Sequence, residues 1–241
     1  MLNNKTNNIR QLILDIQLHD QMNFANFFIG NNIQLINILK NLSIVGGPFS
    51  IFIYAQTGLG KSHLLNAVCQ LFSDKYIPVA YLPLEDVKQF ELNILDNIEN
   101  LDLLCIDDIH LIAGNHAWEK AIFHCFNNIL HNNKKIVITS NIPPQYIPFK
   151  ILDLKSRMLG GLIYPIFELN DDEKISSLKL KAKIRGINLN TRVAKFLLNH
   201  YDRSQNKLFD FLEKIDRETL EAKRKITVPF LKVILQKNFN N

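Results

Sequence analysis

Residues 55–62, AQTGLGKS, combine glycine, lysine and serine at a spacing that suits phosphate binding. The phosphate-loop pattern is G-x-x-x-x-G-K-[ST], and Gly60, Lys61 and Ser62 match it, whereas its first glycine falls on Ala55. Glycines let successive backbone N–H groups converge on phosphate oxygens. Lys61 would neutralise the terminal phosphates, and the Ser62 hydroxyl would ligate magnesium. We therefore assign nucleotide contacts to Gly58, Leu59, Gly60, Lys61, Ser62 and His63.

Two acids end an apolar segment farther along the chain, at residues 103–108, LLCIDD. Four apolar residues followed by Asp107 and Asp108 resemble a Walker B element. Asp107 would hold magnesium through water, and Asp108 would polarise an attacking water. Acids commonly end strands, so this pattern alone is weak evidence. It becomes strong evidence because a phosphate loop precedes it in the same chain. Cys105 is better explained as a small core residue than as a nucleophile.

The elements that must position these residues alternate between strand and helix patterns. Continuous apolar segments predict four buried strands of a parallel sheet covered on both faces. These are Ile51–Ala55, Val79–Leu82, Leu103–Ile106 and Ile136–Thr139. A fifth strand is predicted at Ile163–Leu169, where Pro165 favours an edge position. Helical periodicity at Lys61–Ser73 and Ala117–Leu130 completes a doubly wound α/β domain, which sets the phosphate loop between a strand and a helix.

The pattern changes near residue 170. Asn170 followed by three acids is a helix start signal. Helical stretches follow, interrupted at residues 186–188, 202–205 and 227–229, without another strand signal. Residues 171–241 therefore predict a small all-helical second domain.

Composition limits the classes of protein that fit. The chain has 241 residues and three cysteines. It lacks a signal-peptide pattern and an apolar run of the ~20 residues that a membrane span needs, which favours the cytoplasm. The second domain is basic, because residues 171–241 hold 16 Lys and Arg against 9 Asp and Glu. This excess suits nucleic acid or an acidic partner, but amphipathic helices with a solvated lysine face explain it more simply.

Several motifs together resemble the DnaA-related AAA+ family, in particular its short Hda-like members. They are AQTGLGKSHLL, LLCIDDIHLIAG, IVITSNIPP, DLKSRMLGGLIY and KITVPFLKVIL. The resemblance implies a tail over residues 1–22, a five-stranded AAA+ domain over 23–169 and a helical lid over 170–241. It also implies ADP or ATP with Mg²⁺ as cofactors. The implied function is to stimulate, with the sliding clamp, ATP hydrolysis on the initiator DnaA and so to prevent re-initiation.

The same resemblance assigns three polar residues. Asn141 lies where the family has its sensor 1 residue, which contacts the terminal phosphate or the attacking water. Arg157 matches the arginine finger, which reaches a neighbour's ATP. Lys207 takes the sensor 2 position, where the family usually has arginine. Without the resemblance, Asn141 would be explained as a turn residue and Arg157 as a surface arginine.

The N-terminal tail contains QLILDI, where Hda-like proteins have a clamp-binding motif. Gln11, Leu12, Leu14 and Ile16 match its polar and apolar positions. Asp15 replaces a proline that is common in the family. An amphipathic strand that packs on its own domain is the alternative. Residues 24–30, FANFFIG, resemble a family segment that encloses adenine, and an aromatic core cluster explains them equally well.

Two other functions fit the same sequence. A free-standing AAA+ ATPase that remodels or loads a replication protein, such as a helicase, would use Lys61, Asp107 and Asp108 in its own turnover. An adaptor that recruits the initiator to DNA or a membrane would draw on the basic lid. The sequence ends shortly after PFLKVILQK, so we expect no sequence-specific DNA binding. Because no apolar run is long enough for a membrane span, we also expect no membrane partner. Self-association and the rate of intrinsic turnover stay open.

Overall fold

The computed structural model describes residues 22–44, 47, 49–85, 91–95, 98–222, 227–229 and 231–232. The chain forms two compact units, Met1–Phe167 and Glu168–Asn241. The predicted clamp-binding motif, residues 11–16, lies outside the described residues. Among the described residues, no helix is long and apolar enough to cross a membrane.

The first unit is built on a five-stranded sheet in the order β2-β3-β4-β1-β5, and all paired strands are parallel. The strands are β1 (Ser50–Tyr54), β2 (Val79–Pro83), β3 (Leu103–Asp107), β4 (Lys135–Ser140) and β5 (Leu162–Pro165). The predicted parallel sheet is confirmed, with β5 at an edge. The fifth strand ends earlier than predicted because the chain leaves β1 beyond Ile166. Phe167 N–H donates instead to Asn32 Oδ1 at 2.7 Å.

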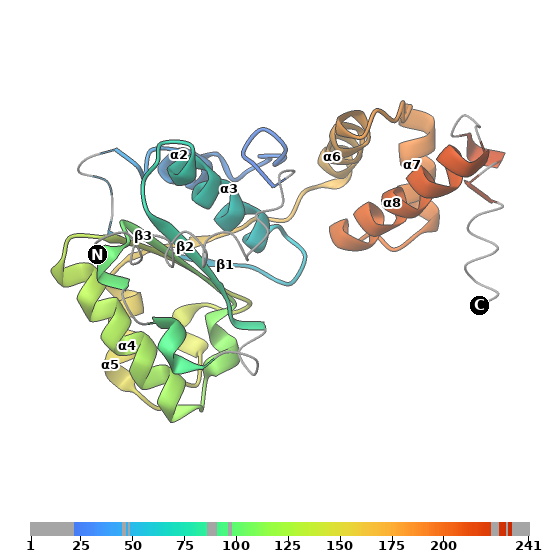
Figure 1. Ribbon diagram of the computed structural model, residues 1–241. Coiled ribbons are helices and arrows are strands. Elements are labelled where there is room, and N and C mark those ends of the chain that lie inside the picture. Colours follow the sequence, from blue (N-terminus) through green and yellow to red (C-terminus); the bar gives the residue numbers. More distant parts are fainter. Residues whose placement is uncertain are drawn as a thin grey trace. The chain divides into compact units, whose positions relative to one another are not determined.

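Helices cover both faces of this sheet, as Figure 1 shows. One face carries α2 (Ile33–Lys40) and α3 (Lys61–Ser73), and the other carries α4 (His116–His131) and α5 (Leu152–Leu159). Alternate residues of β3 serve the two cores: Leu103 and Cys105 pack with α3, whereas Leu104 and Ile106 pack with α4. Both faces are buried, which explains why the strands read as continuous apolar runs. Short 3₁₀ helices lie at Leu92–Leu95, Ile98–Asn100, Ile109–Ile112 and Pro144–Tyr146.

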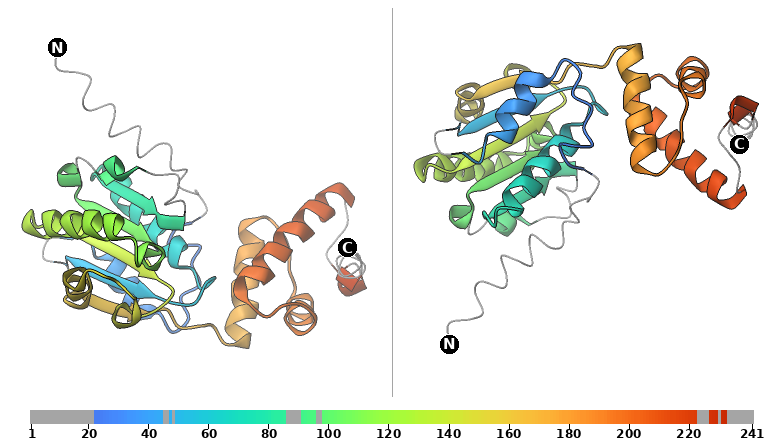
Figure 2. Two further views of the ribbon diagram at one scale, coloured as in Figure 1. Left: turned by 90° about the horizontal axis from the view of Figure 1, so that it is seen from below. Right: turned by 90° about the horizontal axis from the view of Figure 1, so that it is seen from above.

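The second unit contains α6 (Asp171–Ile184), α7 (Thr191–His200) and α8 (Gln205–Ala222), seen from two directions in Figure 2. Asn170 begins α6 with a capping box, in which its side chain accepts from Glu173 N–H and Glu173 accepts from Asn170 N–H. Asn190 caps α7 by accepting from Val193 N–H. The three helices enclose an apolar core that includes Leu178, Leu197 and Phe211. The predicted helical domain is confirmed.

Candidate nucleotide-binding site

The predicted phosphate loop connects the last residue of β1, Tyr54, to the first residue of α3, Lys61. Gly58 and Gly60 have φ angles of 92° and 93°, in the left-handed region that favours glycine. A Cβ on Gly60 would also lie 2.8 Å from Cε2 of Phe27. Ala55, which departs from the pattern, is 6% exposed and packs in the core beside α3. The loop therefore keeps its required glycines where the backbone turns.

Lys61 is buried, with 5% of its side chain exposed. Its Nζ donates to the backbone oxygen of Ala55 at 3.2 Å and to Oδ1 of Asn141 at 2.6 Å. The carboxylate of Asp108 lies 3.7 Å away. A buried cation needs such partners, and a phosphate group could replace them. Lys61, Asp108 and Asn141 come from the carboxyl ends of β1, β3 and β4, where parallel strands meet at one edge of the sheet.

Thr139 on β4 connects the two predicted acids. Its hydroxyl donates to Oδ1 of Asp107 and accepts the backbone N–H of Asp108 at 2.9 Å. Asp107 also accepts, on Oδ2, the hydroxyl of Tyr81 at 2.7 Å. Asp108 has a left-handed backbone with φ 53°. Asp tolerates this conformation better than most residues other than glycine.

His110 also contacts Asn141. Asn141 N–H donates to His110 Nδ1 at 3.4 Å, and the Asn141 side-chain nitrogen lies 3.0 Å from Nε2. Burial lowers the pKa of His110 below its ordinary 6.5, and Lys61 acts in the same direction, although Asp108 and Asp107 oppose it. A neutral ring can accept from Asn141, whereas a protonated ring cannot. The sequence offered no metal spacing for this histidine and gave no other signal for its role.

Aromatic residues of the predicted adenine segment reach the phosphate loop. Phe27 lies against Gly60 and makes an edge contact with the His63 ring at 5.4 Å between centroids. His63 Nε2 lies 2.8 Å from the backbone oxygen of Asn23. Phe24 and Phe27 also pack against the core beside α3. The segment is thus both part of the core and adjacent to the loop; an adenine contact stays a prediction.

The donor set at this edge suits magnesium. Mg²⁺ prefers oxygen ligands and takes few of them from the protein, because waters and nucleotide phosphates complete its shell. Ser62 and Asp107 offer such oxygens, and Asp108 Oδ1 is buried without a hydrogen-bond partner. No group of three or more His, Cys, Asp or Glu side chains could hold a metal unaided among the residues that the structure describes. The set therefore fits a magnesium ion delivered with a nucleotide.

Arg157 lies at the opposite end of the sheet. It is exposed on α5 and lines a hollow of about 380 Å³ together with Ser50 and Leu162, the first residues of β1 and β5. The phosphate loop follows the last residue of β1. Because a strand rises about 3.3 Å per residue, the length of β1 separates the two ends by roughly 13 Å. Arg157 is therefore directed away from the loop of its own chain.

Two buried contacts fix the helix that carries Arg157. Glu119 on α4 is fully buried, and its carboxylate accepts the backbone N–H groups of Gly114, Lys150 and Ile151 at 2.7–2.8 Å. The last two immediately precede α5. After α5, Gly161 packs so closely on Ser50 that a Cβ there would lie 2.8 Å from the Ser50 backbone oxygen. Both ends of α5 are thus held by the rest of the first unit.

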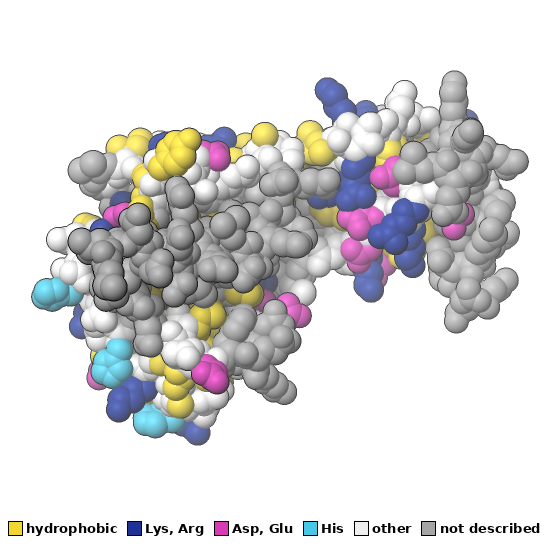
Figure 3. All heavy atoms as spheres, viewed as in Figure 1, with side chains coloured by type: hydrophobic (Ala, Val, Ile, Leu, Met, Phe, Trp, Pro, Cys, Tyr) yellow, Lys and Arg dark blue, Asp and Glu magenta, His cyan; other side chains and the backbone are white. Residues whose placement is uncertain are grey.

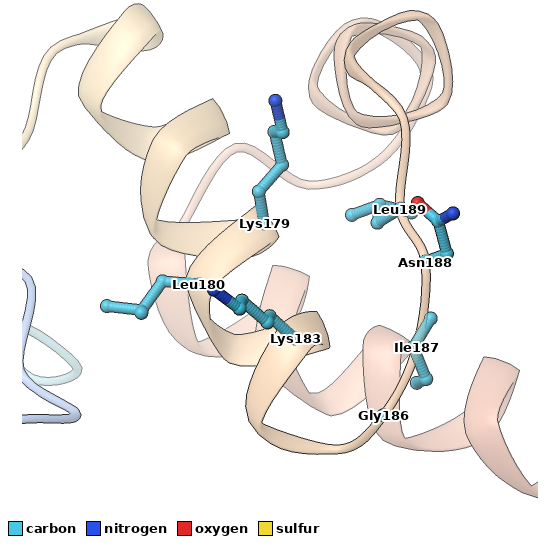
Figure 4. Close-up of a pocket in the computed structure, with 7 residues that line it drawn as sticks. All are labelled: Lys179, Leu180, Lys183, Gly186, Ile187, Asn188 and Leu189. Carbon is cyan, nitrogen blue, oxygen red and sulfur yellow. The ribbon is translucent and has the colours of Figure 1, made fainter.

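Lys207 is exposed near the start of α8, in the second unit. Its predicted contact with nucleotide stays a prediction. The second unit has a hollow of its own, of about 480 Å³, which Figure 4 shows between α6 and the loop that follows it. Lys179 and Lys183 line this hollow, and Lys179 Nζ donates to Thr191 Oγ1. None of the predicted site residues lines it.

Basic side chains of the second unit are interspersed with acids, as Figure 3 shows. Arg185 pairs with Glu213, Arg203 with Asp171, and Lys174 with Glu168. On the face that Figure 3 shows, this mixture among the described residues agrees with solvated helix faces.

The family profile described as the bacterial DnaA ATPase domain matches residues 18–165, and the profile described as the Hda lid domain matches residues 171–235. The chain belongs to the bacterial DnaA ATPase family. With both profiles matched, it is an Hda-like, DnaA-related AAA+ protein and a DnaA-related replication regulator.

Solved structures agree with this DnaA-related assignment. Domain III of Thermotoga maritima DnaA shares the fold, with a TM-score of 0.79 and 23% identity over 91% of this chain and 97% of that one. DnaA from Aquifex aeolicus, solved with AMPPCP, has a TM-score of 0.71 and 26% identity over 83% of this chain and 65% of that one. Another DnaA structure, bound to AMPPCP and single-stranded DNA, has a TM-score of 0.69 and 27% identity over 86% of this chain and 69% of that one.

The sequence did not predict the roles of three side chains at this DnaA-related site. Tyr81, Thr139 and His110 contact the predicted residues, but none belongs to a motif that names its role. Tyr81 pairs with Cys105 in the sheet, two residues before Asp107. A register prediction between the second and third strands would have placed its side chain on the same face as Asp107.

Proposed function

We propose that this chain binds ADP or ATP with Mg²⁺ in its own phosphate loop and, with the sliding clamp, stimulates ATP hydrolysis on the initiator DnaA. Hydrolysis there would prevent re-initiation. The observation that carries the proposal is the placement of Arg157 at the amino end of β1, whereas the phosphate loop follows the carboxyl end. A guanidinium so placed is available to a nucleotide held by another molecule.

The chemistry asked of Arg157 is electrostatic. In phosphoryl transfer, charge spreads over the oxygens of the moving group, and an arginine supplied by a partner is worth ~10³–10⁵ in rate. Arg157 is exposed, and the structure records no ion pair for its guanidinium among the described residues. Phe49 and Leu162, which line the same hollow, are 46% and 41% exposed and would supply an apolar rim for docking.

The chain's own site has the groups that nucleotide binding requires. Lys61 would exchange its contacts with Ala55 and Asn141 for phosphate oxygens. Ser62 and Asp107 would hold magnesium, which neutralises phosphate charge when bound. The AMPPCP-bound DnaA structures support the choice of an adenine nucleotide. Lys207 stands where the family usually has arginine. Its ammonium group supplies a charge but not the planar pair of donors by which a guanidinium binds phosphate. We therefore expect retained ADP rather than rapid turnover.

Attachment to the clamp would raise the local concentration of the two partners, which a weak contact between them requires. Gln11, Leu12, Leu14 and Ile16 are the proposed clamp contacts, and they lie outside the described residues. A short segment that inserts two or three apolar side chains into a pocket is a workable mode of recognition.

The test of the finger is ATP hydrolysis by purified DnaA in the presence of clamp loaded on DNA. Arg157→Ala should abolish the stimulation while ADP binding to the chain persists. Lys155→Ala, which removes a cation from the same helix, is the matched control. If Arg157→Ala stimulates as well as the unaltered chain, the proposal is wrong.

A pull-down with clamp tests the tail separately. The Gln11→Ala, Leu12→Ala double variant should lose clamp while its ADP affinity stays unchanged. Equal capture of clamp by this variant and by the unaltered chain would remove the clamp from the proposal.

The alternative is a free-standing ATPase that remodels or loads a replication protein. One observation favours it: Asp108 Oδ1 is buried beside Lys61 without a hydrogen-bond partner, as a residue that awaits an attacking water would be. Steady-state hydrolysis by the isolated chain separates the two functions. Robust turnover without partners supports the ATPase, and negligible turnover with tightly held ADP supports the regulator.

A further inference from the structure

The hydroxyl of Tyr81 contacts Asp107, one of the two groups proposed to hold magnesium. Tyr81 is on β2, and its side chain faces the same side of the sheet as Asp107 because its register partner, Cys105, is two residues earlier. Its hydroxyl donates to Asp107 Oδ2 at 2.7 Å. The phenol therefore already satisfies one oxygen of the proposed magnesium site.

The Asp107 carboxylate has both oxygens engaged by hydroxyl groups. Thr139 donates to Oδ1 and Tyr81 to Oδ2, and Asp107 is only 5% exposed. A buried carboxylate is costly unless donors or a cation satisfy it. Lys61, the nearby cation, is engaged with Ala55 and Asn141. The two hydroxyls thus do for Asp107 what a divalent cation and its waters would otherwise do.

We propose that the Tyr81 hydroxyl competes with magnesium at Asp107, and so raises the magnesium concentration at which nucleotide binding gains from the metal. Without magnesium, the Tyr81 hydrogen bond stabilises the buried carboxylate. A magnesium ion held near Asp107 would offset the buried carboxylate by its own charge, so the carboxylate would then depend less on the phenol. Removing the hydroxyl destabilises the metal-free state more than the metal-bound state.

The position of Tyr81 also explains why a phenol can perform this role without itself ionising. Burial, together with the charge of Asp107, raises the pKa of Tyr81 far above its ordinary value. The hydroxyl therefore remains a donor at any physiological pH. Its ring packs against the core beside α3, so its direction is fixed by packing and not by the hydrogen bond alone.

The test measures ADP affinity of the full chain by calorimetry, first in EDTA and then over a range of MgCl₂ concentrations. For Tyr81→Phe, the MgCl₂ concentration that gives half of the full gain in affinity should fall roughly tenfold, the effect expected when one hydrogen bond to a charged group is removed. Tyr76→Phe, at a tyrosine that is 93% exposed, is the control and should behave as the unaltered chain. An unchanged or higher concentration for Tyr81→Phe would overturn the inference.

This inference rests on the proposed nucleotide site, and the measurement in EDTA keeps the two failures apart. If the unaltered chain binds ADP neither in EDTA nor with magnesium, the proposed function fails. If it binds ADP but Tyr81→Phe shows no gain in magnesium affinity, the role of Tyr81 alone fails. Thermal unfolding checks the fold of the variant. Should Tyr81→Phe not fold, Tyr81→Met fills similar space without a hydroxyl, and the same shift is expected.

Discussion

The amine of Lys61 and the side-chain oxygen of Asn141 are joined by a 2.6 Å hydrogen bond, although 80 residues separate them in the sequence. This bond links the phosphate loop to the residue that follows β4. It also means that a phosphate group entering the loop must compete with Asn141 for the lysine. The two residues are coupled, so a substitution of either should change the affinity for nucleotide.

Lys61→Ala should weaken ADP binding by about 10- to 100-fold, the effect of losing a charge-assisted hydrogen bond. Fluorescent ADP binding by the purified chain measures this directly. Lys75→Ala, at an exposed lysine just beyond α3, is the control and should bind as before. Equal affinity in the two variants would show that nucleotide does not use the loop.

Gly161→Ala should destabilise the first unit by about 1–3 kcal/mol, because the new Cβ would overlap the Ser50 backbone oxygen and force β5 to shift. Gly160→Ala is the matched control: its Cβ would meet its nearest neighbour at 3.5 Å, an ordinary contact. Chemical denaturation of both variants checks the difference. Equal stability would show that the α5–β5 turn is not constrained as the structure indicates.

Glu119→Ala should cost about 3 kcal/mol or more, because buried backbone N–H groups of Gly114, Lys150 and Ile151 lose their acceptor. Since Lys150 and Ile151 precede α5, we also expect weaker stimulation of DnaA at a temperature where the variant is folded. Unfolding curves and the hydrolysis assay measure the two effects. Glu173→Ala, at the exposed cap of α6, is the control and should leave stimulation unchanged.

His110 should make stability depend on pH. Its pKa is lowered in the folded chain, chiefly by burial, below the ordinary 6.5. Between these two pKa values the unfolded chain binds the proton and the folded chain does not, so stability falls as pH drops through about 6.5 and the loss levels off below the folded pKa. His110→Gln should remove this part of the pH dependence. His131→Gln, at an exposed histidine, should retain it; unfolding at pH 5 to 8 is the measurement.

Much of the fold could be predicted because its signals are local. Continuous apolar runs predicted the parallel sheet. The boundaries of α3 were predicted at Lys61 and Ser73, as the structure has them. Asn170 and Glu173 indicated the start of α6. The end of β5 was missed, because Phe167 turns to Asn32, a residue 135 positions away. Local periodicity carries no information about such a partner.

The sequence by itself determined the strand–loop–helix at residues 50–73 and the acids at the end of β3, since glycine spacing and apolar runs act through the local backbone. Only the tertiary structure decided that Lys61 meets Asn141, that Tyr81 and Thr139 take the two oxygens of Asp107, and that Arg157 lies at the far end of β1. The physical reason is strand order. β4 lies between β1 and β3, and this order joins strands that are distant in the sequence, which local patterns do not encode.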